Sequence, residues 1–405
     1  MATHRWIFTA AILVVILSLP IAGHAVSWNS PIPLTSDSIT HVQPRISLDG
    51  TRIVYMANPP SYGTFQIFAM NSNGSEVRQL TANTGSNLVP YTNGNGTLTV
   101  FFSDMSGSFQ IYKVKSDGTG LTQLTFPPPS APKTVSDYPV ISSDGSQLVF
   151  QSNRTGLMEM FAMNSDGSGI TQLTSNNAIH EHASISSDGK IVAFDSDATT
   201  AGNREIFMVN SDGTGLHQLT FNSGDNYAPV MSADGRFVAF QSNSTGRYEI
   251  WLIGTSGSGL KQLTFDTVDD QSPAINYDGS IIAYRTTVSG SSQIKVIIAA
   301  TGEVDQLTSN LDNNYAPSIN GAGTSVAYQG NVAGFTQLFF VTQVSSAVGG
   351  SVIPVDKLAL FAPFLVILIA SLIGGAVFYE KYGHRSSVPA SYRSVRTRIE
   401  TNSHA

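Results

Sequence analysis

Cysteine is absent from all 405 residues of this chain. That absence excludes disulfide bonds, thiol catalysis, thiolate metal sites and iron–sulfur clusters, so an ordered domain must rely on its hydrophobic core. The sequence also lacks the Gly-x-Ser-x-Gly turn of a nucleophilic serine, the His-Glu-x-x-His helix of a metallopeptidase and the Gly-Lys-Ser/Thr of a phosphate-binding loop. The sequence therefore identifies no catalytic residue.

A long repeat is present instead. The triplet Gln-Leu-Thr occurs six times at intervals of 44 to 49 residues, beginning at Gln79, Gln123, Gln172, Gln218, Gln262 and Gln306. Between the triplets, runs of β-branched and aromatic residues alternate with Asp-Gly and Gly-rich turns, a pattern that indicates antiparallel strands joined by hairpins. A period of about 40–50 residues of this kind is typical of the blades of a propeller.

The turns give the number of blades. The turn after the first strand of each repeat is Asp-Gly five times, at Asp49, Asp144, Asp188, Asp234 and Asp278. With two degenerate copies, Asn95-Gly96 and Ala322-Gly323, it marks seven repeats, one more than the Gln-Leu-Thr strands. The last repeat stops near Thr342, one strand short, and residues 31–35 have the form of the missing strand. We therefore predict an all-β, seven-bladed propeller over residues 26–344, closed by its N-terminal strand, which removes an exposed sheet edge. A six-bladed ring with one divergent repeat outside it is the alternative.

The repeat resembles that of the TolB-type, WD40-like propeller family. The resemblance rests on Pro-x-Ile-Ser-x-Asp-Gly, as at residues 139–145, and on Asn-x-Asp-Gly-x-Gly before Gln-Leu-Thr, as at residues 164–169. It covers roughly residues 30–344 and implies the fold. Members of the family are protein-binding modules, domains fused to peptidases and a few enzymes, so the resemblance leaves the function open. The chain differs from the periplasmic protein that names the family, because it has no separate N-terminal α/β domain and has a predicted C-terminal anchor.

Both ends of the chain carry targeting signals. Residues 1–25 combine a short basic start, an apolar run at 6–19 and small residues up to Ala25, which predicts a signal peptide; an uncleaved signal anchor is the alternative. Residues 358–379 contain no charged side chain and are long enough to cross a membrane as one transmembrane helix. The tail, 380–405, carries five Lys and Arg against two Asp and Glu, so the positive-inside rule places it in the cytoplasm. We predict a single-pass, type I protein of the cell membrane, with the propeller outside the cell and a flexible linker over 345–357.

Other features bear on source and partners. Residues 352–358, together with the apolar run that follows, resemble the C-terminal anchors of archaeal surface proteins. Residues 26–355 carry 14 Lys and Arg against 25 Asp and Glu, a net charge of −11, so nucleic acid is not expected as a partner. Asn-x-Ser/Thr sequons that a glycosylating host could modify stand at Asn73, Asn95, Asn153 and Asn243.

Alignment of the repeats brings out one set of polar positions. Three residues before each strand-entry proline, or before Ala183 in one repeat, the residue is always polar. These seven residues are His41, Asn87, Ser136, His180, Asn226, Asp270 and Asn314. We expect them on the connections between blades, around the mouth of the channel, where Tyr138, Tyr227 and Tyr315 beside the prolines would add aromatic contacts. Polar loops that merely cap turns are the alternative explanation.

One local cluster has the character of a metal site. His180 and His182 could bind a divalent ion, with Asp225 or Asp270 as further ligands. A pair of loop histidines without a ligand, one of them at the aligned polar position, is the favoured alternative. The first hypothesis for function is a cell-surface module that binds a protein, peptide or glycan without catalysis or cofactor. An extracytoplasmic hydrolase or lyase acting at the channel mouth, and a structural envelope protein, are the alternatives.

Overall fold

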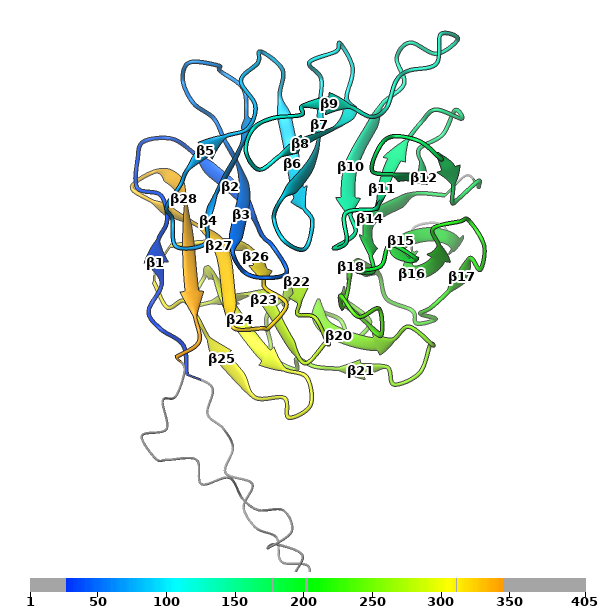
Figure 1. Cartoon of the computed structure of the whole chain (residues 1–405). Helices are drawn as coiled ribbons and strands as arrows, with labels where there is room; N and C mark the ends of the chain where they lie inside the picture. The colour runs from blue at the N-terminus through cyan, green and yellow to red at the C-terminus, as the bar shows by residue number, and fades with distance from the viewer. Residues whose placement is uncertain (1–26, 177, 201–202, 311, 345–405) are drawn as a thin grey trace, which may run out of the picture. The chain divides into compact units, whose positions relative to one another are not determined.

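The computed structural model describes residues 27–176, 178–200, 203–310 and 312–344. This part of the chain folds into seven four-stranded antiparallel sheets that stand around one axis (Figure 1). The described residues contain strands and turns but no helix, so none of their segments is a helix that could cross a membrane. The predicted all-β, seven-bladed propeller is confirmed, and the six-bladed alternative is excluded.

Each blade runs from an inner strand at the axis to a short outer strand. The first two blades are β2 (His41–Ile46), β3 (Arg52–Ala57), β4 (Gln66–Asn71) and β5 (Arg78–Gln79), then β6 (Asn87–Thr92), β7 (Leu98–Ser103), β8 (Gln110–Lys115) and β9 (Thr122–Gln123). The third and fourth are β10 (Ser136–Ile141), β11 (Gln147–Ser152), β12 (Glu159–Asn164) and β13 (Thr171–Gln172), then β14 (His180–Ile185), β15 (Ile191–Thr200), β16 (Asn203–Asn210) and β17 (His217–Gln218). The fifth and sixth are β18 (Asn226–Met231), β19 (Phe237–Ser242), β20 (Glu249–Gly254) and β21 (Lys261–Gln262), then β22 (Gln271–Ile275), β23 (Ile281–Val288), β24 (Ser291–Ile298) and β25 (Val304–Gln306).

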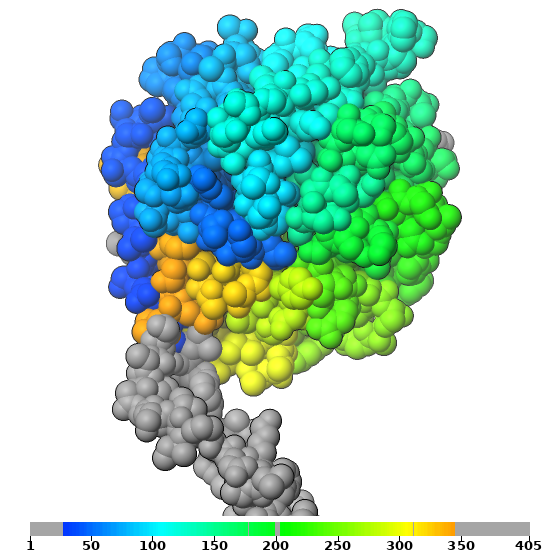
Figure 2. Space-filling model, in the orientation of Figure 1, coloured from blue at the N-terminus to red at the C-terminus, as the bar shows by residue number. Residues whose placement is uncertain are grey.

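The seventh blade joins the two ends of the described chain. It contains β26 (Asn314–Ile319), β27 (Ser325–Val332), β28 (Phe335–Thr342) and, as its outer strand, the N-terminal β1 (Ile32–Pro33). Ile32 pairs with Phe340, and Pro33 pairs with Phe339. In Figure 2 the N-terminal segment, in blue, lies against the last strands, in orange. The predicted closure by the N-terminal strand is therefore confirmed.

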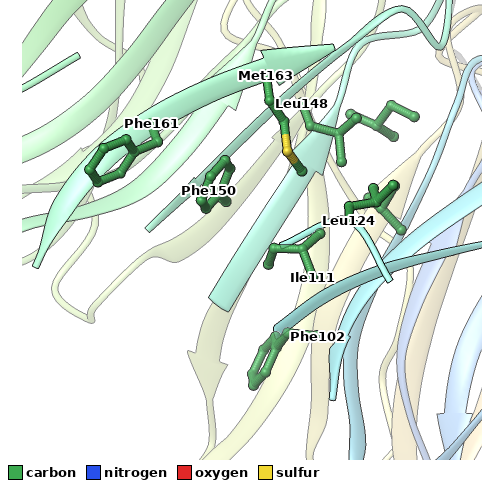
Figure 3. Close-up of a cluster of buried hydrophobic side chains, with 9 residues drawn as sticks. Phe102, Ile111, Leu124, Leu148, Phe150, Phe161 and Met163 are labelled. Carbon is green, nitrogen blue, oxygen red and sulfur yellow. The ribbon is translucent and has the colours of Figure 1, made fainter. Parts of the chain in front are cut away.

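The core lies between neighbouring blades. Figure 3 shows one of its clusters, in which Phe102 and Ile111 of the second blade pack against Leu148 and Phe150 of the third. Phe150 is fully buried, and burial of an aromatic or aliphatic side chain of this size contributes about 1.5–3 kcal/mol. Each inter-blade face buries a cluster of this kind, so the stability of a blade depends on its neighbours.

The Gln-Leu-Thr segment pairs over fewer residues than predicted. In the fifth blade only Lys261 and Gln262 belong to the outer strand, and Leu263 is buried in the core. The hydroxyl of Thr264 donates to Glu249 Oε2 at 2.6 Å and accepts from the backbone N–H of Ile250 at 2.9 Å. The threonine side chain thus forms hydrogen bonds where the backbone pairing of the outer strand ends. This role gives a reason for the recurrence of the triplet.

Every inner strand carries the same bulge. One residue of each inner strand has a φ between 45° and 55°: Gln43, Val89, Tyr138, His182, Ala228, Ser272 and Ala316. Proline follows it in six blades and Ala183 in one, and the strand pairing shifts register at this point. Proline has no N–H to donate, so it fits a position that leaves the ladder. The bulge turns this residue away from the ladder, and six of the seven bulge residues line the mouth of the channel.

The predicted signal peptide, linker, transmembrane helix, cytoplasmic tail and archaeal-type anchor motif lie outside the described residues.

Candidate functional site

A cavity of about 360 Å³ opens where the inner strands begin. Its wall consists of the bulge residues, the prolines beside them and a few larger side chains. The bulges hold these residues in left-handed backbone conformations, which cost free energy and concentrate at sites that a fold must position accurately. The mouth is therefore a rigid, concave surface of the kind that binds ligands.

The polar groups in the wall favour an anion. Polar groups come from Arg45, Tyr91, Tyr138, His182, Tyr227 and Gln241 among others, and no Asp or Glu is among the described residues that line the cavity. The Arg45 guanidinium lies 4.6 Å from the ring centre of Tyr91 and forms no ion pair within the described part of the chain. A guanidinium held by an aromatic ring and free of a carboxylate partner can bind a carboxylate or another anion of a ligand.

A charged cluster backs one side of the mouth, between the fourth and fifth blades. Asp195 on β15 is fully buried, and its carboxylate accepts from His182 Nδ1 at 2.8 Å, from Arg204 at 2.6 Å and from the backbone N–H of Ala228 at 3.1 Å. Arg204 also pairs with Glu181 at 2.7 Å and lies 5.0 Å from the ring centre of Tyr227. The cluster fixes the ring of His182, whose side chain stays half-exposed at the cavity wall with Nε2 free of any protein partner described.

His182 therefore presents a titratable nitrogen to the cavity. Burial opposes its protonation, but the hydrogen bond to Asp195 and the charges of Asp195 and Glu181 outweigh that effect and raise the pKa of His182 above its usual value. A carboxylate that orients an imidazole in this way also suits general acid–base chemistry. The arrangement can thus bind an anion when His182 is protonated, or accept a proton when it is neutral.

The seven aligned polar residues lie deeper than predicted. Six of them are the first residues of the inner strands and Asp270 immediately precedes β22, and all seven side chains are 5 % exposed or less. The sequence predicts them on the connections around the mouth, and the bulge two residues later instead places them under its rim. Their burial makes them supports of the mouth. That any of them contacts a ligand stays a prediction. They are His41, Asn87, Ser136, His180, Asn226, Asp270 and Asn314.

Most of these residues belong to a buried polar triplet at the junction of two blades, which we call the junction triplet. It consists of a Gln or Glu at the start of the third strand, the Thr of Gln-Leu-Thr and the first residue of the next inner strand. In the fourth blade, Asn226 Nδ2 donates to Glu205 Oε2 at 2.7 Å, and the hydroxyl of Thr220 donates to the same oxygen at 2.6 Å. Burial raises the pKa of Glu205 to about 7, although both hydrogen bonds oppose the shift.

The predicted tyrosines have different positions. Tyr138 is a bulge residue, 53 % exposed, and lines the cavity together with Tyr227. Tyr315 occupies the same repeat position as Tyr227, but its ring faces the guanidinium of Arg285 at 5.6 Å and is not part of the cavity wall. Two of the three tyrosines are thus placed to contact a ligand.

The two histidines proposed to share a metal ion have separate partners. His180 Nε2 lies 2.8 Å from Asn176 Oδ1 and 3.3 Å from Glu159, and burial lowers the pKa of His180 to about 4. His182 instead groups with Glu181 and Asp195, whose ligand atoms lie within 4.8 Å of one another. Arg204 pairs with both of these carboxylates, so a cation is already present there. The proposed partner Asp270 lies in another acidic group, with Glu249 and Asp266.

The four sequons differ in accessibility. Asn73 and Asn95 are exposed in hairpin turns, where their side chains accept bonds only from residues two positions later. Asn153 and Asn243 are half-buried, and their Oδ1 atoms accept the backbone N–H groups of Val135 and Asp225. Asn73 and Asn95 are therefore the better placed for glycosylation.

Sequence reasoning missed the charged residues of the mouth. Arg45 and Tyr91 each follow a strand-entry proline by one residue, so the repeat alignment contained a signal for them. Asp195 and Arg204 come from the second and third strands of one blade, and only the folded sheet brings them to His182. No feature of the linear pattern marks that encounter.

Comparison with known proteins agrees with this architecture. The family model described as the TolB beta propeller domain matches residues 128–294. A structure of an oligogalacturonate lyase in complex with manganese superposes with a TM-score of 0.63 at 15% identity, covering 79% of this chain and 97% of that one. The crystal structure of TolB from Acinetobacter baumannii gives a TM-score of 0.50 at 19% identity, covering 67% of each chain.

A third group of similar structures is larger than this chain. A puromycin-hydrolyzing peptidase of Mycobacterium tuberculosis gives a TM-score of 0.60 at 15% identity, and the match covers 79% of this chain but 55% of that one. Comparison with curated proteins gives no match. At these identities the structural likenesses establish the fold, which TolB, oligogalacturonate lyases and peptidases share.

Proposed function

We propose that this chain, of which residues 128–294 match the TolB beta propeller domain model, is a membrane-anchored module of the cell surface that binds a protein, peptide or glycan at its channel mouth. The ligand carries an anionic group, such as a carboxylate, which Arg45 and protonated His182 hold. The predicted signal peptide and the apolar segment 358–379 support the location outside the cell.

The composition of the cavity wall carries this proposal. The domain as a whole is acidic, yet the wall contains Arg45 and His182 and no carboxylate. Tyr91, Tyr138 and Tyr227 supply flat apolar faces beside these groups, as sites for sugars and peptides commonly do. Because the bulges fix the wall before binding, little conformational entropy is lost when the ligand docks.

Calorimetry with matched ligands tests the proposal. The full-length chain, purified in detergent, is titrated with acidic oligosaccharides and acidic peptides, and with their esterified or amidated counterparts. We expect binding of an acidic ligand, a loss on esterification and a roughly 10- to 100-fold weaker Kd in Arg45→Ala, the effect of one charged hydrogen bond. Arg52→Ala is the control, because Arg52 lies away from the cavity wall and pairs with the exposed Glu76. Equal affinity of wild type and Arg45→Ala for every ligand would contradict the proposal.

A hydrolase or lyase is the second candidate, and the His182–Asp195 pair favours it. A buried carboxylate orients the imidazole and leaves Nε2 at the cavity wall, as a general base requires. Ligands found by calorimetry would be incubated with the protein and the products followed by mass spectrometry. Turnover that His182→Ala abolishes and Arg52→Ala preserves would establish catalysis. Metal content measured on wild type and on a His180→Ala, His182→Ala double variant tests whether an ion takes part.

A further inference from the structure

The junction triplets balance donors and acceptors in most of the ring. At the first junction Asn87 Nδ2 donates to Gln66 Oε1 at 3.0 Å and to Asn83 Oδ1 at 3.2 Å. At the sixth junction Asn314 Nδ2 donates to Asn310 Oδ1 at 2.7 Å and lies 3.4 Å from Gln293 Oε1. The pattern in both places is one glutamine and two asparagines, four residues apart, with no formal charge.

At the junction between the fifth and sixth blades, acids stand in place of the glutamine and of both asparagines. Glu249 stands where the pattern has glutamine, and Asp266 and Asp270 stand where it has the two asparagines. Carboxylate oxygens of the three residues lie within 4.8 Å of one another. Three amides have thus been replaced by three groups that, when ionised, accept hydrogen bonds and donate none.

Asp270 shows the consequence most clearly. Its side chain is fully buried, and neither carboxylate oxygen has a hydrogen-bond partner among the described residues. The hydroxyl oxygen of Thr286 is also buried without a hydrogen-bond partner among the described residues. Buried carboxylates are expected to be paired, hydrogen-bonded or bound to a cation.

Protein cations do not neutralise this group. Lys295 Nζ lies 3.6 Å from Asp266 Oδ2 and is the one ion-pair partner the three acids have in the described chain. The other acidic group, around Asp195, differs in this respect because Arg204 contacts two of its carboxylates at 2.6 and 2.7 Å. When ionised, three carboxylates with one ammonium leave an excess of negative charge that a bound cation would balance.

We propose that Glu249, Asp266 and Asp270 bind a calcium ion that ties the fifth blade to the sixth. All donors are hard oxygens, which suit Ca²⁺ and disfavour the nitrogen- and sulfur-preferring transition metals. The ligands come from the start of β20 and from the loop before β22, an irregular arrangement that Ca²⁺ tolerates better than the strictly octahedral Mg²⁺. Asp266 is exposed and gives the ion a route from solvent, and Thr286 offers a further oxygen.

Thermal unfolding of the full-length chain tests the site. Wild type is melted at pH 7.5 in EDTA, in Ca²⁺ and in Mg²⁺, and calorimetry gives the number of ions bound. We expect one Ca²⁺ per chain and a Tm about 4 °C higher when Ca²⁺ is in 100-fold excess over its Kd. Identical Tm values in EDTA and Ca²⁺, or an equal response to Mg²⁺, would overturn the assignment.

Two variants separate this site from a general salt effect. Asp270→Asn restores the residue found at Asn226 and Asn314, so we expect it to fold and to lose the Ca²⁺ response. Glu205→Gln removes a buried acid one junction away and should keep the wild-type response. A Ca²⁺ response that survives in Asp270→Asn would refute the proposal, and so would one that Glu205→Gln abolishes.

Discussion

Two arcs of the ring share one backbone and differ in charge. The junction triplets of the sixth, seventh, first and second blades begin with glutamine: Gln293, Gln337, Gln66 and Gln110. Those of the third, fourth and fifth blades begin with glutamate: Glu159, Glu205 and Glu249. The charged cluster of Asp195 and Arg204 lies in the middle of this acidic arc. Since the amide arc shows that the fold needs no charge at these positions, the charges of the acidic arc point to a local specialisation, which stability alone does not explain.

Among the variants that compare neighbouring blades, Asp195→Ala should lower the free energy of unfolding the most. Asp195→Ala leaves Arg204 and His182 without their buried partner, so we expect the free energy of unfolding to fall by about 3–5 kcal/mol in urea denaturation. Gln241→Ala is the matched variant, because Gln241 has the same repeat position and makes one bond of this kind, to the N–H of Ser272 at 2.8 Å. That loss should be about 1 kcal/mol. Equal decreases in the free energy of unfolding would mean that the charged cluster contributes no more stability than the single hydrogen bond of Gln241.

Replacing a glutamate of the acidic arc by glutamine should remove a pH dependence of the free energy of unfolding. The pKa of Glu205 is about 7 in the folded protein and about 4.3 in an unfolded chain, so the folded state keeps a proton that the unfolded state releases. The free energy of unfolding therefore falls as the pH rises between those values. Glu205→Gln should be more stable than wild type by about 2 kcal/mol at pH 8 and unchanged at pH 4.

The reverse exchange provides the control for that prediction. Gln293→Glu places a buried acid in the amide arc, where Thr308 and Asn314 can still donate to it. It should acquire the pH dependence that Glu205→Gln loses. A pH dependence of stability that stays as in wild type in both variants would show that these carboxylates are solvated.

The smallest effect concerns the titration of His182. Asp195 and Glu181 raise its pKa, so nuclear magnetic resonance should show it protonating above the usual value of about 6.5. The resulting stabilisation is present below the unfolded pKa and is lost as the pH rises through the folded pKa. Glu181→Gln should lower the pKa of His182, because it removes one of the two charges that raise it. A His182 pKa that Glu181→Gln leaves unchanged would contradict the coupling.

The architecture was predictable because its signals are local. An Asp-Gly pair needs only its own hairpin to adopt a positive φ, so turns such as Asp144-Gly145 could be counted without knowledge of the fold. The closing strand followed from the same count, because one repeat lacked a strand and the N-terminus held a spare one.

The site was less predictable, for a physical reason. Strand alternation assigns a face to each residue, and the bulge at residues such as Tyr138 and His182 shifts that register by a step that simple alternation does not include. The residues chosen for the rim, Asn226 among them, therefore lie beneath it, and Arg45 takes a place in the wall. The contact between Asp195 and Arg204 depends on the pairing of two strands, and no periodic pattern in the sequence predicts it.

The closing strand also determines the order in which the ring can assemble. Leu338 bonds to Thr35, a residue 303 positions away, so this contact closes a loop that includes almost the whole propeller. During synthesis the first blade therefore exposes an apolar flank until the last blade emerges, and β1 has no sheet to join before then. Closure of so long a loop is entropically costly and gains little until the flanking blades have packed, which places it at the end of folding. The ring is thus completed only after residue 342 has been synthesised. A chain released earlier exposes the apolar flanks of its first and last blades to solvent, where they can aggregate.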